Sequence, residues 1–206
     1  MMLGNGCQDE GDEDLLIQIA ESIANISEHA QNKVELVQMG ILHCLVSLCK
    51  HGSINVKRGT SRAFALLSSS PENAVGVFDE KAIPSIIELL SCQEEEISRD
   101  AAAAISNVAV GDFVKVIGKL GGISPLIHLL SSSFESCQLN SCKALSRLTA
   151  TLEENKNAVF DEDGLSPLIQ LCASTNQEVT LAAVMVMCNI STLECHQIAT
   201  EWTPCT

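Results

Sequence analysis

Apolar residues along this chain are grouped in short segments that return at a nearly constant interval. The clearest is 121–130, GGISPLIHLL, and related segments occupy 40–49, 81–90 and 163–172. Their starts are 41, 40 and 42 residues apart. A period of this size is typical of proteins built from stacked, equivalent units, each too small to bury its apolar face alone.

Within each period, the spacing of apolar residues predicts two short helices followed by a longer third helix. Gly40 and the pair Gly121-Gly122 are expected to end first helices, since glycine tolerates positive φ. Ser124-Pro125 and Ser166-Pro167 are expected to supply an N-cap and an N1 proline to second helices. The expected helices are 32–39, 42–50 and 55–68; 73–79, 84–91 and 95–110; 112–119, 124–130 and 136–150; and 155–161, 166–172 and 177–191.

The expected third helices share a second repeated block, which supports the period independently. The block is at 23–27, 64–68, 105–109, 145–149 and 187–191, with steps of 41, 41, 40 and 42. The first copy lies on a lone helix at 14–27, and a lone first helix is expected at 195–202. We therefore divide the chain into a flexible acidic leader at 1–13, a helical array at 14–202 and a flexible tail at 203–206.

Composition narrows the fold and the ligand class. Hydrophobic residues make up 46% of the chain but aromatic residues only 3%, which favours close helix packing and an all-α fold. A net charge of −14 argues against nucleic acid or a membrane surface as the main ligand. The ten cysteines fall largely in apolar runs without a C-x-x-C pair, so we expect reduced thiols and a cytoplasmic or nuclear location.

The repeating unit resembles the armadillo repeat, whose second helix reads like G-A-I-P-P-L-V-x-L-L and whose third helix reads like A-L-x-N-L. Asn32, Asn73 and Asn155 match the asparagine that opens the family's first helix, whereas unit three has Asp112. The resemblance extends over 14–202. It implies a right-handed α-solenoid of four full units, with a leading third helix and a trailing first helix. The chain also resembles, more loosely, the armadillo segment of combined ankyrin-and-armadillo proteins.

In this family the third helices line a concave ligand groove, so the resemblance implies candidate ligand residues on those helices. The nuclear-import receptors of this family clamp basic peptides with a Trp one helical turn before the asparagine of the A-L-x-N-L pattern. This chain has no Trp at that position. Five of its 12 Lys and Arg residues fall on the expected groove face, which is similar to the catenin-type groove for acidic, extended ligands. The candidates are Arg58, Arg62, Arg99, Lys143 and Arg147 for carboxylates, and Asn25, Asn107 and Asn189 for ligand backbone.

Two less specific interpretations stay open from the sequence. The cations can simply lie on solvated helix faces without a ligand, with the asparagines hydrogen-bonded to water. The chain can also be a scaffold segment of a larger solenoid or multidomain protein that binds, or associates with itself, through open apolar ends. Two departures from the family pattern, Leu66 and Gly59, make unit one unusual, and Gly59 should cost about 1 kcal/mol relative to Ala.

The sequence does not predict catalysis, a cofactor or a metal site. The five histidines fall in unrelated positions of the repeat, so they do not converge with a nucleophile. The sequence contains no H-E-x-x-H, phosphate-loop or dinucleotide-binding pattern. We therefore expect a non-catalytic module whose partner is a protein or peptide.

Overall fold

The computed structural model of this chain describes residues 10–79 and 81–192, and within these ranges the regular structure is α-helical. One long helix is followed by four successive units of two short helices and one long helix. The expected all-α solenoid is confirmed. The trailing helix expected at 195–202 lies outside the described residues, as does most of the acidic leader.

The thirteen helices of the described ranges are close to those expected from the apolar pattern. The main difference is at the start, where the first helix begins at Glu10 rather than at Asp14. The helices are α1 (Glu10–Ile26), α2 (Ala30–Gln38), α3 (Ile41–Cys49), α4 (Ile54–Ser68), α5 (Asn73–Asp79), α6 (Ala82–Leu90), α7 (Glu95–Val108), α8 (Phe113–Lys119), α9 (Ile123–Leu130), α10 (Glu135–Thr149), α11 (Glu153–Asp161), α12 (Leu165–Leu171) and α13 (Gln177–Ser191).

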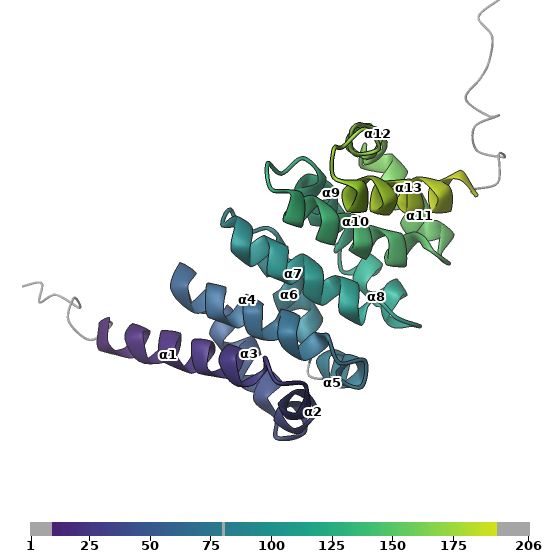
Figure 1. Cartoon of the computed structure of the whole chain (residues 1–206). Helices are drawn as coiled ribbons and strands as arrows, with labels where there is room; N and C mark the ends of the chain where they lie inside the picture. Colours follow the sequence, from purple (N-terminus) through teal and green to yellow (C-terminus); the bar gives the residue numbers. More distant parts are fainter. Residues whose placement is uncertain (1–9, 80, 193–206) are drawn as a thin grey trace, which may run out of the picture.

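The long helices α1, α4, α7, α10 and α13 form one layer, and the short helices pack behind and beside them (Figure 1). Each long helix packs along the next one in the chain. Small residues allow this close approach: Ala101, Ala102 and Ala104 of α7 are fully buried, and Ala182 and Ala183 of α13 are buried as well. The long helices therefore present their remaining side to solvent as one continuous face.

The break between the first and second helices has the same backbone geometry in every unit. Gly40 and Gly121 have φ values of 83° and 79°, as expected for glycines that end a helix. Lys81 and Asp163 occupy the same position in the other two units, with φ values of 54° and 57°. The repeat geometry therefore imposes a left-handed backbone conformation at this position even where the residue is not glycine.

The second helices begin earlier than the prolines suggested, so the expected N-caps are wrong. α9 and α12 start at Ile123 and Leu165, which places Ser124 and Ser166 inside the first turn. Pro125 is then the third residue of its helix rather than the first. The position is still tolerated, because the N–H groups of the first turn have no partner within the helix.

Asparagines of the first helices fasten the end of the preceding long helix. The Nδ2 of Asn73 donates to the carbonyl oxygens of Leu67 and Lys33, at 2.8 and 3.0 Å. Asn155 makes the equivalent bonds to Leu148 and Val114, at 2.8 and 3.3 Å. Asp112 in unit three makes no side-chain cap bond. Beside it, Phe113 stacks on Phe78, with ring centroids 4.4 Å apart.

Gly59 is buried where α4 crosses α1, and the structure changes the interpretation of this residue. A Cβ atom added at Gly59 would lie 2.8 Å from Ala20 Cβ and 3.1 Å from the Ala20 carbonyl carbon. The absent side chain is therefore what lets the two helices approach each other. Gly59 carries a cost in helix propensity, but it is required by the packing.

We predict that Gly59→Ala destabilises the protein by about 1–3 kcal/mol, because the added methyl group overpacks the α1–α4 contact. Helix propensity alone predicts the opposite sign, a gain of about 1 kcal/mol. Urea unfolding followed by circular dichroism measures the difference. Gly52→Ala is the matched control, since nothing lies within 4 Å of its Cβ position. A stabilised Gly59→Ala protein would show that the contact relaxes freely.

Candidate functional site

Three rows of side chains run across the exposed side of the long helices, and together we call them the third-helix face. Every member keeps part of its surface exposed. The outer row is Ile17, Arg58, Arg99, Leu139 and Leu181. The middle row is Glu21, Arg62, Ala103, Lys143 and Met185. The ladder row is Asn25, Leu66, Asn107, Arg147 and Asn189.

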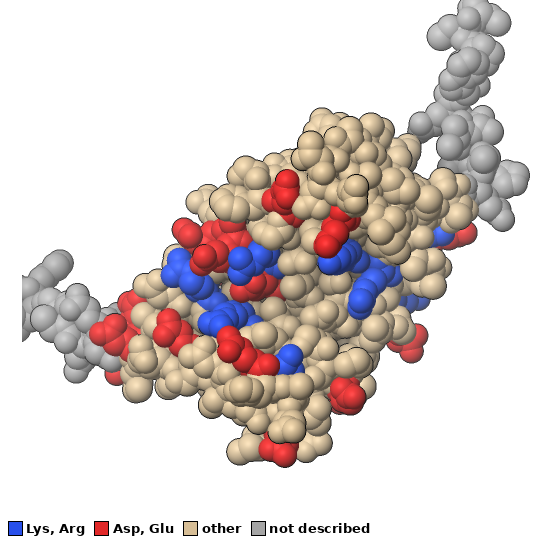
Figure 2. Space-filling model, viewed as in Figure 1, with Lys and Arg blue, Asp and Glu red and all other residues tan. Residues whose placement is uncertain are grey.

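All eight candidate residues from the sequence therefore lie on this face. In Figure 2, which views the layer of long helices, basic side chains gather over the middle of the face with acidic side chains between them. The third helices had been expected to bring the five cations together, and the structure does so. Their chemical surroundings, however, differ from one helix to the next.

The ladder residues bond to the unit before them. Nδ2 of Asn107 donates to Ala65 O and to Ser68 Oγ, at 3.4 and 3.3 Å. Nδ2 of Asn189 donates to Ser146 O and to Thr149 Oγ1, at 2.8 and 3.2 Å. These amide N–H groups therefore connect neighbouring long helices by hydrogen bonds. Within the described ranges no hydrogen bond reaches the Oδ1 atom of either asparagine, so each keeps one acceptor for a ligand.

Arg147 occupies the same position as an asparagine and makes the same kind of bond. Its Nη1 donates to Ser106 O at 2.8 Å, and Ser106 directly precedes the ladder residue of α7. Leu66 has no donor, so the ladder is interrupted at α4. Beside this gap, Asn25 Oδ1 accepts a bond of 3.4 Å from Arg62 Nη1.

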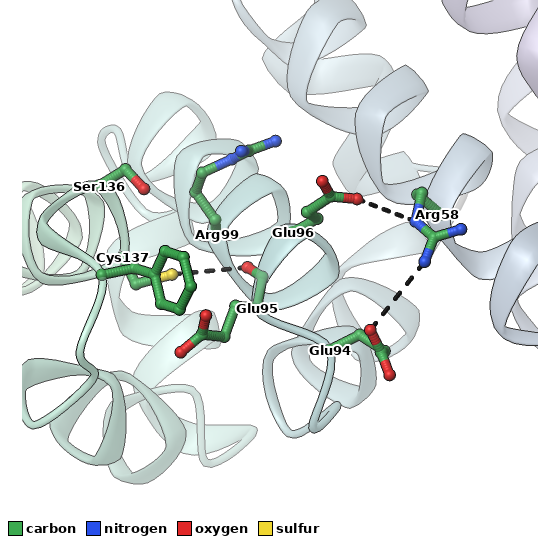
Figure 3. A pocket seen from close by; sticks show the side chains of 8 residues that line it. Arg58, Glu94, Glu95, Glu96, Arg99, Ser136 and Cys137 are labelled. Carbon is green, nitrogen blue, oxygen red and sulfur yellow. Dashed lines mark hydrogen bonds and ion pairs between the residues drawn. The ribbon is translucent and has the colours of Figure 1, made fainter.

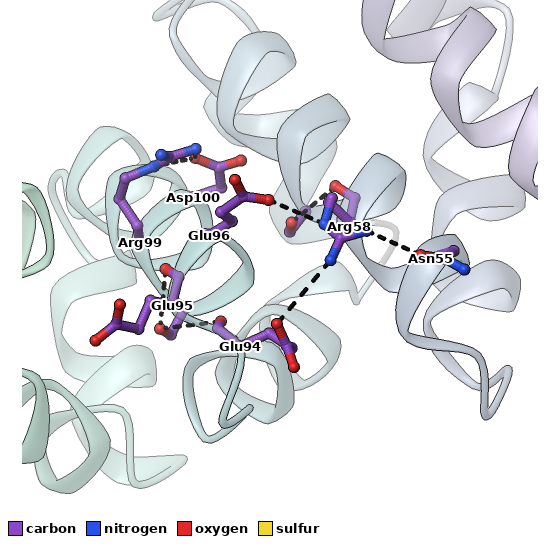
Figure 4. Close-up of polar contacts among 9 residues, drawn as sticks. Asn55, Arg58, Glu94, Glu95, Glu96, Arg99 and Asp100 are labelled. Atoms are coloured by element: carbon purple, nitrogen blue, oxygen red, sulfur yellow. Dashed lines mark hydrogen bonds and ion pairs between the residues drawn. The ribbon is translucent and has the colours of Figure 1, made fainter. Parts of the chain in front are cut away.

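Three of the five cations are paired with carboxylates of the chain itself, and Figure 4 shows the pairs of Arg58 and Arg99. Arg58 Nε lies 2.9 Å from Glu96 Oε2, without hydrogen-bond alignment, and Arg58 Nη2 lies 4.0 Å from Glu94. Arg62 pairs with Glu28. Arg99 binds Asp100 through Nε and Nη2, at 2.9 and 2.8 Å. The N-terminal half of the third-helix face is therefore largely neutralised from within.

The two cations of α10 differ from these three. Lys143 and Arg147 are exposed, and no carboxylate of the described residues lies within 4.0 Å of their charged groups. They stand one helical turn apart, so both side chains project on the same side of α10. The positive charge available to a ligand is therefore concentrated on one helix.

A cleft of about 380 Å³ opens where the N-terminal ends of α7 and α10 meet α4 (Figure 3). Its charges are mixed, because Arg58 and Arg99 share the lining with Glu94, Glu95 and Glu96. Arg99 points away from Glu95. Cys137 donates its thiol to Glu95 O at 3.5 Å, and burial raises the pKa of this thiol. The cleft consequently lacks a reactive thiolate and a uniform charge.

The cysteines are only partly as expected. Cys49, Cys137 and Cys142 are buried, whereas Cys188 is exposed on α13. Burial raises the pKa values of Cys49 and Cys142 to about 12, so both stay protonated near neutral pH. In the described part of the chain no cluster of three or more His, Cys, Asp or Glu side chains is arranged to hold a metal ion.

A membrane span is not evident from the helices. No single helix within residues 10–79 and 81–192 is both long and apolar enough to cross a bilayer. Helices α8 and α9 reach that length and composition together, but they meet at 80°.

Comparison with known proteins identifies the repeat. The family model for the armadillo/β-catenin-like repeat matches residues 70–110 and 112–150, which are units two and three. Units two and three are thus armadillo-like repeats by sequence, and the chain as a whole is similar to armadillo-repeat proteins. Units one and four lie outside these matched residues, and Gly59 and Leu66 of unit one depart from the repeat pattern.

Curated relatives and solved structures agree with this assignment. Armadillo repeat-containing protein 3 of Homo sapiens is 28% identical over 182 residues, covering 88% of this chain. Armadillo repeat-containing protein gudu of Drosophila melanogaster is 25% identical over 178 residues, covering 84% of this chain. The chain spans only 21% and 26% of these two proteins. Computationally designed armadillo repeat proteins for modular peptide recognition superpose with a TM-score of 0.80 at 25% identity, covering 88% of this chain and 78% of theirs.

The residues that the sequence did not predict are the acidic partners of the arginines on the third-helix face. Glu28, Glu94 and Glu96 neutralise arginines that belong to a neighbouring unit, 34 to 38 residues away in the chain. Only Asp100 left a local signal, because it directly follows Arg99. Its side chain is only 13% exposed, and desolvation raises its pKa even though Arg99 donates to it.

We predict that Asp100→Asn stabilises the protein at pH 7, and that this gain shrinks as the pH is lowered. The raised pKa means that the folded state holds the Asp100 proton more tightly than the unfolded state does. The wild-type protein is therefore favoured below the ordinary value of 3.8 and loses that stability as the pH rises through the folded pKa.

Urea unfolding of both proteins over a pH series measures this difference. Asp161→Asn, at an exposed position, controls for the loss of one negative charge. A gain from Asp100→Asn that is constant with pH, or larger in acid, would show that burial does not govern this carboxyl.

Proposed function

We propose that this chain is a non-catalytic protein-interaction module that binds an extended, acidic peptide segment along the third-helix face. One observation carries the proposal: five of the 12 cations gather on one face of a chain whose net charge is −14. An extended ligand suits a face built from parallel rows, because it can contact successive helices. Carboxylates suit it because arginine donates to them through two parallel N–H groups.

The ladder supports a backbone contact in addition to the charge contacts. Asn107 and Asn189 are held in place by their bonds to the preceding unit, so their Oδ1 atoms need little ordering to accept ligand N–H groups. The family and the fold are those of protein-interaction solenoids, and the designed relatives are described by their peptide recognition. We further propose the cytoplasm or the nucleus as the place of action, with no role for nucleic acid, a membrane or a cofactor.

A second candidate function is association through the α12–α13 side, where the described part of the solenoid stops. Leu181 of α13 and Ile169 of α12 are 63% and 59% exposed, and Val184 is partly exposed beside them. The equivalent residues one unit earlier include Cys142 and Ile127, which are buried by the following unit. A partner with an armadillo-like helical unit, a second copy included, could cover this end in the same way.

We predict that Arg62→Glu combined with Lys143→Glu weakens binding of an acidic peptide by about tenfold or more, because both changes place negative charge in the middle row. A labelled peptide of alternating Glu and Ser, followed by fluorescence anisotropy at low ionic strength, measures the affinity. Lys50→Glu combined with Lys115→Glu makes the same change in net charge at exposed positions outside the rows. Equal losses in the two double variants would reduce the effect to net charge and contradict the proposal.

Internal carboxylates should compete with an acidic ligand. We predict that Glu28→Gln combined with Glu96→Gln tightens binding of the same peptide by about three- to tenfold, because Arg62 loses its partner and Arg58 keeps only the more distant Glu94, at 4.0 Å. Glu35→Gln combined with Glu72→Gln removes the same charge from exposed positions on the first-helix side. An increase in peptide affinity that is no larger than in this control would mean that the paired arginines take no part in binding.

A further inference from the structure

The five long helices do not offer the same chemistry to a ligand. On α4 and α7, each arginine of the third-helix face is held by a carboxylate of this chain, from Glu28, Glu94, Glu96 or Asp100. A ligand that binds there must displace an existing ion pair. Exposed ion pairs are weak. Breaking an internal pair therefore costs about as much free energy as the arginine gains by pairing with the ligand. The strongest point of attachment should therefore lie elsewhere.

Helix α10 provides that point. Lys143 and Arg147 are exposed, and no carboxylate of the described residues lies within 4.0 Å of their charged groups. Arg147 is also held in place, because its Nη1 donates to the Ser106 carbonyl of α7. Its other guanidinium N–H groups stay available, and the ordering cost of this long side chain is already met in the free protein. Two adjacent cations of this kind favour a carboxylate or a phosphate.

The neighbouring helix α13 adds an apolar surface. Met185 is 51% exposed and occupies the same row as Lys143, while Leu181 is the last residue of the outer row, which also contains Arg58 and Arg99. On the other side of Lys143 stands the small Ala103, so the cations are not crowded from α7. Large exposed apolar side chains next to a polar anchor are typical of protein-interaction sites.

The spacing allows one extended segment to use both surfaces. Packed helices lie roughly 8–10 Å apart, and an extended chain advances about 3.3 Å per residue. A ligand residue that places its anionic group against α10 is therefore followed, about three residues along, by a residue against α13. The Asn189 Oδ1 atom, in the ladder row of α13 one turn after Met185, can accept a backbone N–H group of such a segment.

We infer that the α10–α13 part of the third-helix face recognises an anionic side chain followed about three residues later by a bulky apolar side chain. The inference rests on the proposed function and narrows it, from a general acidic ligand to a two-point motif. Lys143 and Arg147 bind the anion, Met185 and Leu181 contact the apolar side chain, and the arginines of α4 and α7 contribute little while their internal pairs are intact.

Two labelled peptides test the motif. The first carries Glu and Leu three positions apart in a Ser-rich background, and the second replaces each Leu by Ser. We expect the first to bind about tenfold more tightly than the second, since each buried Leu side chain adds apolar contact. A third peptide with phosphoserine in place of Glu decides which anion fits better, and tighter binding of either form supports the anionic anchor.

Single variants assign the two contact points. Lys143→Glu should weaken binding of the Glu–Leu peptide by about tenfold, whereas Arg62→Glu, at a paired cation, should change it by less than about threefold. Met185→Ser should reduce the affinity for the Glu–Leu peptide to that of the second peptide, which keeps Glu but has Ser in place of Leu. Val184→Ser is the matched control, because Val184 lines the cleft at the end of the solenoid with Leu181 and Cys172 and does not belong to the rows.

The outcomes separate the inference from the proposed function. If both peptides bind equally and Met185→Ser has no effect, the apolar contact is wrong, and the acidic-ligand proposal stands. If Arg62→Glu weakens binding as much as Lys143→Glu, the anchor is not on α10. If Val184→Ser has the larger effect, the apolar residues serve end-to-end association instead. If neither peptide binds the wild-type protein at low ionic strength, the proposed function fails as well. Circular dichroism of each variant confirms that it is folded.

Discussion

The close packing of each long helix along the next is the constraint on which this structure depends. The short helices are too small to form a core alone, and they are ordered by the layer of α1, α4, α7, α10 and α13. The contact requires small residues at the crossing points, such as Ala104 in α7 and Gly59 in α4. It also requires the ladder bonds, in which a side chain of one unit donates to a backbone carbonyl of the unit before it.

The ladder bonds stabilise the packing of the long helices and also fix the orientation of side chains on the third-helix face. Because Asn107 and Asn189 use their Nδ2 groups for the preceding helix, their Oδ1 atoms are fixed in position at the surface. Arg147 keeps the structural bond of an asparagine but exchanges the amide acceptor for additional donors and a positive charge. The ladder position of α10 therefore offers N–H donors and a positive charge where an asparagine offers an amide acceptor.

Charge on this face is decided by pairing as well as by residue type. Arg58, Arg62 and Arg99 would form a basic strip if they were considered without their surroundings, yet each has an acidic partner from the chain itself. The consequence is a face with a largely neutral N-terminal half, two cations on α10 without an ion pair among the described residues, and an apolar region on α13. Because these three regions follow the order of the units, the two ends of the face differ in charge and polarity.

Much of this fold could be derived from local pattern. The spacing of apolar segments determined the number of units and their short, short, long helices, because helix periodicity and helix breaks are local properties. Gly40 and Gly121 end helices as their residue type predicts. The same register placed all eight candidate residues on the exposed side of the long helices, since residues three or four apart share a helix face.

Only the tertiary structure decided the rest, because it depends on atoms that are distant in the chain. Lys81 and Asp163 adopt left-handed backbone because the stack requires the turn, against the preference of the residues themselves. Gly59 is needed because Ala20 lies against it, and nothing near Gly59 in the sequence indicates this. Likewise, Glu96 neutralises Arg58 across a helix–helix contact. The sequence by itself determined where the cations stand, and the packing of neighbouring units decided which of them remain free for a ligand.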